Sequence, residues 1–442
     1  MLEKIKEAIN CLDELSQKKK FKIISHFDTD GITSAAIFSR ALKRWGKGFS
    51  LKIVKSLDEE TIQELGEEEI LIFLDLASGS LEYLAKKKTE VFVFDHHELS
   101  DGDKTKIPEN VFMVNPVLHN CEAMSAAAIC YLFAKELSIE NKDLAKLAVI
   151  GMVGDLHEKN ISKAFGEILS DAETIVKKGV LIYPSTRPLD KALEYSSNPY
   201  IPSVSGSRTG VIELLRDAGL SIDNGKYKAL YELNKEEMTN LVTAIMLRGQ
   251  KGGGEERLIG NLFLVKFFNK LEDARELSAL INACSRMDYP EVALGFCLGN
   301  RKLKEEAEKI YLNYKQSLVS ALKYVSETSK LEGKNYMIIN ARDKIKDTII
   351  GTIASILSHS PLYQEGLVIV ALSYNENMIK VSARLAGRKG RNVRELLYKA
   401  VVPIGGEVGG HPQAAGCMIS REKEGEFIGE LKKVLELEVV KV

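Results

Sequence analysis

Long apolar runs, paired cysteines and an excess of either charge are all missing from this sequence. The longest apolar runs, such as Ile70–Leu74, fall far short of the ~20 residues that a membrane-spanning helix needs. The N-terminal residues alternate charged and apolar side chains and lack the apolar core of a signal peptide. Six cysteines form no CxxC pair, which argues against a zinc ribbon or disulfide framework and favours free thiols in a reducing compartment. We therefore expect a cytoplasmic protein without a membrane segment.

The near-neutral charge excludes one further class of protein. Lys and Arg number 61 against 62 Asp and Glu, so the formal net charge of −1 excludes a generally basic nucleic-acid binder. A local positive patch is compatible with this balance and is all that nucleic-acid binding requires. The 442 residues, of which 45% are hydrophobic and 28% charged, are typical of a globular protein with about two to four domains.

The first 160 residues or so alternate short apolar runs with helical patterns, which predicts an α/β fold with a doubly wound, mostly parallel sheet. In such sheets, ligands bind outside the carboxyl ends of the strands. A mainly helical stretch, a charged linker helix and a second, smaller α/β pattern follow. The expected strands lie at 21–25, 51–55, 70–76 and 91–95, and the expected helices at 32–45, 81–87, 122–136 and 144–151.

Carboxylates and histidines gather at four element ends. His26, Asp28 and Asp30 follow the first strand and would point to one side of an extended segment. Asp75 ends the third strand, Asp95-His96-His97 the fourth, and Asp155 ends an apolar helix. Carboxylates in one cleft repel one another unless cations neutralise them, so we expect a metal site.

The ligand types also select the metal. Carboxylates and imidazoles without thiolates favour Mn²⁺, with Mg²⁺ as the weaker alternative. There are enough ligands for two ions that share a carboxylate, an arrangement suited to attack on phosphate. Taken singly, each of these residues would more often cap a helix or form a hydrogen bond in the core. The remaining histidines His119, His157 and His359 are expected to be structural or surface residues.

In this order, HFDTDG, Asp75, Asp95-His96-His97 and GMVGD resemble motifs I to IV of the DHH phosphoesterase superfamily. Gly409-Gly410-His411 resembles the signature of its DHHA1 domain, and Ile281–Arg286 (INACSR) resembles the INAxxR motif of RecJ-type single-strand exonucleases. KVSARLAGRKGRNVREL is similar to the substrate-binding stretch of that group. The resemblance implies a DHH catalytic domain at 1–185, an insertion with the INAxxR segment at 186–300, a linker helix at 301–330 and a DHHA1 substrate-binding domain at 331–442.

Carried over by position, the resemblance implies a role for each matching residue. One metal would be held by His26, Asp28 and Asp75, and a second by Asp30, Asp75, His96 and Asp155, with Asp75 bridging. His97 would contact the scissile phosphate, and His411 would reach it from the second domain. The residues that would hold phosphates in addition are Asn282, Arg286, Ser382, Arg384, Arg388, Gly409 and Gly410.

Two departures from the bacterial pattern stand out. Ser285 occupies a position where RecJ-type enzymes commonly have glycine. The stretch 186–280 matches nothing in that pattern and resembles the insertion of archaeal RecJ-like proteins, which are related to a eukaryotic replicative-helicase subunit. Relatives of this type associate with the GINS replication complex or with the Hef helicase/nuclease, so either is an expected partner. A homo-oligomer is also compatible with the sequence.

A basic run precedes the glycine-rich C-terminal motif. Seven positive residues and one acidic residue lie within Lys380–Lys399, which predicts a phosphate-backbone track. The leading hypothesis is a metal-dependent exonuclease that acts on single-stranded DNA or RNA in replication or repair. The alternatives are a phosphodiesterase for short oligonucleotides or cyclic dinucleotides, and a scaffold protein with a vestigial nuclease site.

Overall fold

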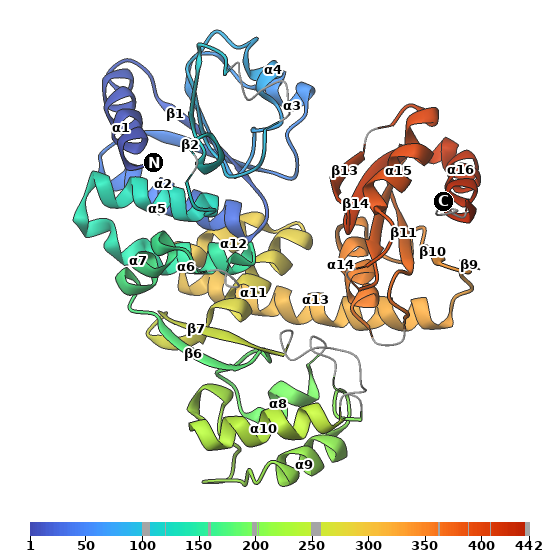
Figure 1. Cartoon of the computed structure of the whole chain (residues 1–442). Helices are drawn as coiled ribbons and strands as arrows, with labels where there is room; N and C mark the ends of the chain where they lie inside the picture. Colours follow the sequence, from blue (N-terminus) through green and yellow to red (C-terminus); the bar gives the residue numbers. More distant parts are fainter. Residues whose placement is uncertain are drawn as a thin grey trace. The chain divides into compact units, whose positions relative to one another are not determined.

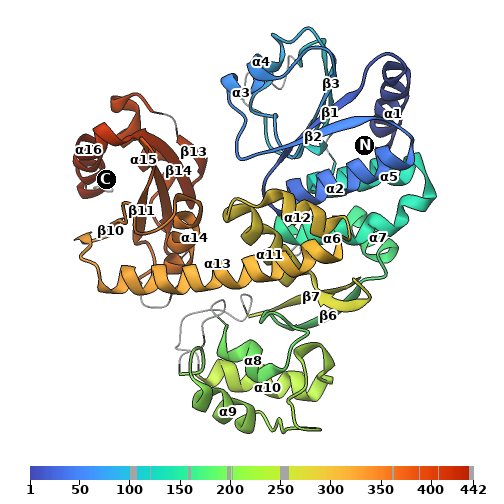
Figure 2. The same cartoon turned by 180° about the vertical axis from the view of Figure 1, so that it is seen from behind.

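A computed structural model of the chain describes residues 1–99, 107–119, 121–157, 161–196, 201, 203–248, 258–360, 363–387, 389–406 and 408–437. The chain divides into two compact units, which Figure 1 shows from one side and Figure 2 from behind. Unit 1 comprises Met1–Ser196 and Ile201–Tyr311, and unit 2 begins at Leu312. No helix in the described ranges is long and apolar enough to cross a membrane.

A five-stranded parallel sheet underlies the site in unit 1, with the strand order β2-β1-β3-β4-β5. The predicted doubly wound α/β class is confirmed. Every residue of β3 and β4 is buried, which explains why both strands are continuous apolar runs. The sequence analysis did not predict β5, although its apolar run VFMV is as long as the run VFVF of β4. The strands are β1 (Phe21–His26), β2 (Phe49–Val54), β3 (Ile70–Leu74), β4 (Val91–Phe94) and β5 (Val111–Val114).

The strand order places a topological switch point between β1 and β3. From β1 the chain crosses to β2 on one side, and then to β3 on the other side of β1. Ligands of open parallel sheets bind at such a point, outside the carboxyl ends of the strands. His26 is the last residue of β1 and Asp75 directly follows β3, so both side chains start from this position.

Helix α2 (Thr29–Arg44) is buried along almost all of its length and packs against α5 (Ala126–Leu137) and α6 (Ala145–Gly154). Small residues in all three helices allow this close packing. At Gly151 of α6, an added Cβ would lie 2.5 Å from Ala127 Cβ and 2.7 Å from Asp30 Oδ1. The other helices of this part are α1 (Leu2–Ser16), α3 (Glu59–Glu64), α4 (Leu81–Leu84) and α7 (Lys163–Asp171), with 3₁₀ turns at Pro116–His119 and Ile139–Leu144.

The rest of unit 1 combines helices with a second, antiparallel sheet of order β6-β7-β8. Helices were expected here and strands were not, although β7 contains the buried apolar run Leu262–Val265. Its pairing with the distant β6 has no local signal. The elements are β6 (Ile175–Val180), α8 (Leu189–Glu194), α9 (Arg208–Asp217), a 3₁₀ turn (Leu230–Glu232), α10 (Lys235–Arg248), β7 (Ile259–Phe267), β8 (Lys270–Asp273), α11 (Ala274–Arg286) and α12 (Pro290–Cys297).

Helix α13 (Arg301–Glu327) crosses from unit 1 into unit 2. Unit 2 is a six-stranded mixed sheet of order β13-β14-β12-β11-β10-β9, in which only β10 and β11 pair in parallel. Its elements are β9 (Leu331–Gly333), β10 (Tyr336–Asn340), α14 (Asp347–Ser358), β11 (Val368–Asn375), β12 (Met378–Leu385), α15 (Val393–Val401), β13 (Val408–His411), β14 (Ala414–Ser420) and α16 (Glu424–Glu436), with 3₁₀ turns at Val402–Ile404 and Arg421–Lys423.

The contact of α6 with α2 and α5 gives a test of the packing. Gly151→Ala should destabilise the protein by about 1–3 kcal/mol, because the new methyl group has no room between the helices. Gly166→Ala is the matched control, since an added Cβ in the middle of α7 meets no atom within 4 Å. The control should be neutral or stabilising by up to about 1 kcal/mol, because alanine favours a helix. Thermal denaturation followed by circular dichroism measures both, and equal midpoints would contradict the packing.

Candidate metal centre

The first cluster of the site joins the ends of β1 and β3. His26 Nδ1 lies 3.1 Å from Asp28 Oδ2 and 3.4 Å from Asp75 Oδ2. Asp28 is the N-cap of α2 and accepts a hydrogen bond from the backbone N–H of Gly31. Glycine is required at position 31, because an added Cβ would lie 2.2 Å from the carbonyl oxygen of His26. His26, Asp28 and Asp75 each offer an atom that could ligate one metal ion.

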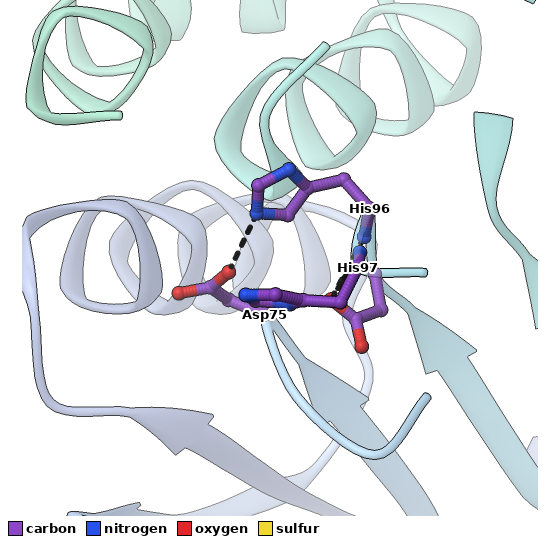
Figure 3. Close-up of side chains that lie close together, drawn as sticks. Asp75, His96 and His97 are labelled. Carbon is purple, nitrogen blue, oxygen red and sulfur yellow. Dashed lines mark hydrogen bonds and ion pairs between the residues drawn. The ribbon is translucent and has the colours of Figure 1, made fainter. Parts of the chain in front are cut away.

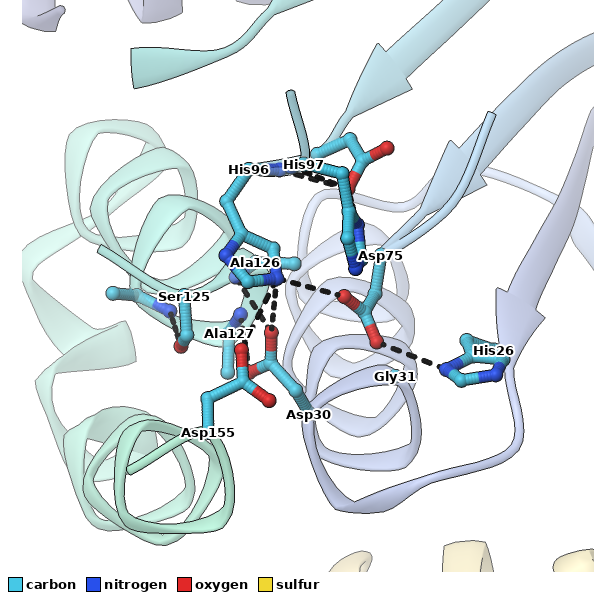
Figure 4. A network of polar contacts seen from close by, with 12 residues as sticks. His26, Asp30, Gly31, Asp75, His96, His97, Ser125, Ala126, Ala127 and Asp155 are labelled. Carbon is cyan, nitrogen blue, oxygen red and sulfur yellow. Dashed lines mark hydrogen bonds and ion pairs between the residues drawn. The ribbon is translucent and has the colours of Figure 1, made fainter. Parts of the chain in front are cut away.

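Asp75 stands between this cluster and His96. Its Oδ1 lies 3.3 Å from His96 Nε2, so its two oxygens face different imidazoles, as Figure 4 shows. Figure 3 shows the same carboxylate beside His96 and His97. The backbone of Asp75 has a φ of +61°, in the left-handed region that residues other than glycine seldom adopt. The structure thus places one oxygen of Asp75 beside each of two imidazoles.

Asp95 holds the two histidines that follow it. Its buried carboxylate accepts hydrogen bonds from the N–H groups of Ser78 and His96 and lies 2.7 Å from His97 Nδ1. Burial opposes its ionisation, but the hydrogen bond and charge of His97 keep the pKa of Asp95 well below its usual range. The same hydrogen bond raises the pKa of His97, whose side chain is 57% exposed. Asp95 therefore orients the His97 ring through Nδ1, which leaves Nε2 on the opposite side of the ring.

Asp30 lies differently from the prediction. The sequence predicted an extended segment through Asp30, but β1 ends at His26 and Asp30 is in the first turn of α2. The helix begins early because the Asp28 side chain caps it. The alternation that would have turned three side chains to one side is therefore lost, and this part of the prediction is wrong.

The carboxylate of Asp30 points toward the start of α5 instead. Its Oδ2 accepts a hydrogen bond from the N–H of Ala126 at 2.7 Å, and its Oδ1 accepts one from Ala127 at 3.0 Å. It lies 4.0 Å from His96 Nε2. Asp30 thus satisfies two N–H groups that a helix start leaves without partners. The contacts are drawn in Figure 4.

A third cluster forms where α6 ends. Asp155, the C-cap residue of α6, has its Oδ2 3.1 Å from His96 Nε2 and 4.0 Å from His157 Nε2. The possible ligand atoms of His96, Asp155 and His157 all lie within 4.8 Å of one another. Sequence reasoning assigned His157 to the structural or surface residues. Its spacing of two from Asp155 was the only available signal.

The charges of the site fit a divalent cation. Burial and the neighbouring charges of Asp28 and Asp30 raise the pKa of Asp75 well above its usual range. Burial and the charge of Asp30 raise the pKa of Asp155 to about 9. Among the described residues, no hydrogen bond reaches either oxygen of Asp75. Buried carboxylates without donors need cations, and oxygen and imidazole donors without thiolate suit Mn²⁺ or Mg²⁺. The residues therefore fit a metal.

The predicted INAxxR segment lies on α11, beside the start of α2. Asn282 Oδ1 accepts a hydrogen bond from the N–H of Thr29 at 3.1 Å, and the hydroxyl of Thr29 donates to the carbonyl oxygen of Ser278. Arg286 is the last residue of α11 and lies one helical turn after Asn282. The structure thus brings Asn282 to the first turn of α2, although nothing in the sequence linked the two segments except the family resemblance.

In unit 2, strand register gathers the other predicted phosphate-binding residues. Gly416 of β14 pairs with Ser382 on one side and Gly409 on the other. Ala414 likewise pairs with Arg384 and His411. Residues opposite one another, and those two apart along a strand, share a face of the sheet. Ser382, Arg384, Gly409 and His411 therefore lie on one face.

Gly410, Arg384 and Arg391 make contacts within unit 2 that the sequence did not predict. Gly410 has a φ of +119°, and an added Cβ would lie 2.4 Å from the carbonyl oxygen of Ala414, so only glycine fits. Arg384 is held by the hydroxyl of Ser355 and by backbone carbonyls. Arg391 donates to the last carbonyls of α16, which makes it a helix cap rather than part of a continuous basic track. Arg388 lies outside the described residues.

Comparison with known proteins assigns three domains to the chain. Residues 20–152 match the DHH family N-terminal domain, 182–263 the DHH-CID domain and 333–437 the DHHA1 domain. An uncharacterised protein of Methanocaldococcus jannaschii is 28% identical over 98% of this chain and 99% of its own length. The segment that had no counterpart in the bacterial pattern is thus largely a recognised domain.

Solved structures show the same fold. Exonuclease RecJ bound to manganese is 18% identical, with a TM-score of 0.61 over 98% of this chain and 95% of its own. RecJ of Thermus thermophilus in complex with Mn²⁺ has the same identity and TM-score, and this chain spans 54% of its length. CDC45 of Entamoeba histolytica is 14% identical, with a TM-score of 0.68 over 98% of this chain and 99% of its own.

The chain therefore belongs to the DHH/DHHA1 family, whose members are typically metal-dependent phosphoesterases. Within that family its fold is RecJ-like.

Substitution of Asp75 tests the metal centre. Mn²⁺ should raise the thermal midpoint of the wild-type protein, because the folded state binds the ion and the unfolded state does not. Asp75→Asn should lose most of this shift. Without metal, the variant should unfold at the same temperature as the wild type or higher, because a buried charge without a hydrogen-bond donor is gone.

Asp13→Asn is the matched control, because Asp13 lies on the exposed face of α1 and its side chain is 55% exposed. It should keep the full Mn²⁺ shift. An unchanged shift in Asp75→Asn would contradict the assignment of Asp75 as a ligand.

Proposed function

We propose that this protein is an exonuclease that uses two divalent metal ions to hydrolyse phosphodiester bonds of single-stranded DNA or RNA stepwise from an end. The observation that carries the proposal is the position of Asp75. Its two buried oxygens face His26 and His96 at 3.4 and 3.3 Å, between two groups of ligands. Such an arrangement suits two ions that share a carboxylate. Mn²⁺ is the preferred metal and Mg²⁺ the alternative.

The metal ligands and His97 have separate roles in this proposed reaction. The bound ions would supply a nucleophilic water and stabilise charge on the reacting phosphate oxygens. The first site would be held by His26, Asp28 and Asp75, and the second would draw on Asp30, Asp75, His96 and Asp155. His97, oriented by Asp95 through Nδ1, would present Nε2 to the scissile phosphate.

Two features favour a strand over a small substrate. Asn282 is fixed beside the start of α2, and Arg286 follows it one turn later, so α11 can carry contacts to neighbouring phosphates. On unit 2, the exposed Gly409 and His411 lie on the same face as Arg384 and would offer further phosphate contacts, whereas Ser382 of that face is buried. We extend the proposal to a role in DNA replication or repair, with GINS or Hef as candidate partners.

His97→Ala tests the catalytic assignment. The variant should degrade a labelled single strand of about 30 nucleotides at least ~10²-fold more slowly in Mn²⁺, because it loses a donor to the reacting phosphate. Its Mn²⁺-dependent rise in thermal midpoint should persist. His119→Ala, at an exposed histidine in a 3₁₀ turn, should retain full activity. Equal rates for His97→Ala and wild type would place the activity elsewhere.

His411→Ala tests the contribution of unit 2. Loss of a phosphate contact should slow degradation of the long strand more than hydrolysis of a dinucleotide, while Mn²⁺ binding stays unchanged. Strands labelled at the 5′ or the 3′ end, as DNA and as RNA, report substrate class and direction in the same assay. Activity on the dinucleotide alone would favour the small-substrate phosphodiesterase instead.

A further inference from the structure

The chain turns sharply just after α6, and this turn brings a second imidazole into the site. Leu156 has a φ of +61°, in the left-handed region that a leucine rarely adopts. Its own side chain is 59% exposed, so no packing of Leu156 accounts for the conformation. The turn leaves the Asp155 carboxylate beside both His96 and His157. Strained backbone of this kind is concentrated at functional sites.

The geometry of His96, Asp155 and His157 is that of a ligand set. His96 Nε2 and His157 Nε2 lie 3.1 and 4.0 Å from the same oxygen, Asp155 Oδ2. The two imidazole rings are 6.0 Å apart between centroids, at an angle of 56°. Ligand atoms bound to one ion at about 2.1 Å lie roughly 3 Å apart, so small rotations of these side chains suffice to bring them together. Within the described residues, the His157 side chain has no hydrogen-bond partner, and only 17% of it is exposed.

Asp30 shares its carboxylate between this site and the start of α5. Both of its oxygens already accept hydrogen bonds from the first turn of α5. The cluster of His96, Asp155 and His157 forms without it. His157 would add a second imidazole donor to the site that His96 and its neighbouring carboxylates form.

We propose that His157 ligates the second metal ion, together with His96 and Asp155. This inference rests on the proposed function. It predicts that the second group of ligands determines which metal ion the site prefers. Two imidazoles and a carboxylate favour Mn²⁺ and later transition metals over Mg²⁺, which prefers oxygen ligands. The first group, His26, Asp28 and Asp75, contains only one imidazole. Selectivity for Mn²⁺ would therefore reside in the second group.

Direct measurement of bound Mn²⁺ tests this assignment without reference to activity. Electron paramagnetic resonance of free Mn²⁺ during titration gives the number of bound ions and their affinities. In His157→Ala, the affinity of one site should fall at least ~10-fold while the other stays unchanged. Pulsed measurements on the bound ion should also show the loss of one imidazole nitrogen coupling. Mg²⁺ competition should become more effective at the weakened site.

Two further variants test whether His157 acts as a metal ligand. His157→Gln keeps the length of the side chain and should show the same loss, which separates ligation from packing. His119→Ala is the histidine control and should bind Mn²⁺ like the wild type. If the wild type binds two ions and both His157 variants match it, the assignment of His157 is overturned and the proposed function stands. If the wild type binds no Mn²⁺, both proposals fail.

Discussion

The structure of unit 1 depends on a set of carboxylates that are buried at the switch point of a parallel sheet. Asp75 is the extreme case, because it is 2% exposed and neither of its oxygens accepts a hydrogen bond within the described part of the chain. Burial and the charges of Asp28 and Asp30 raise its pKa. Such a group destabilises a fold unless cations compensate it. The surrounding elements are arranged around this constraint.

The starts and ends of helices position several of these carboxylates. The Asp28 cap begins α2 immediately after β1, and the C-cap of α6 carries Asp155. Glycines allow the backbone to approach closely, at Gly31 beside His26 and at Gly151 between α2 and α5. Asp95 then fixes the two histidines that follow β4. The ligands are thus positioned by regular elements and their caps, which holds them more firmly than a long loop would.

The parts of this structure that sequence could predict are those with local signals. Apolar runs gave β1, β3 and β4, and the polar residues after them located the site. β5 was not predicted, although its apolar run is as long as that of β4. The pairing of β6 with β7 has no local signal, because it joins distant segments. Alternation failed at Asp30 because a capped helix replaced the extended chain. Arg391 looked like part of a basic track, but its partners are carbonyls of α16, which only the tertiary structure brings near.

The position of Asp30 affects the choice of substitution for making an inactive form of such a protein. Its carboxylate accepts hydrogen bonds from two N–H groups at the start of α5 and lies close to Gly151 of α6. Replacing it with alanine would strip the α5 terminus of its acceptors and open a space between three helices, whatever it does to chemistry. Loss of activity in such a variant could arise from disturbed folding or from lost catalysis, and the variant would not distinguish the two. His97 is the cleaner position for a catalytically dead form, because its side chain is 57% exposed and its ring has Asp95 as its only hydrogen-bond partner among the described residues.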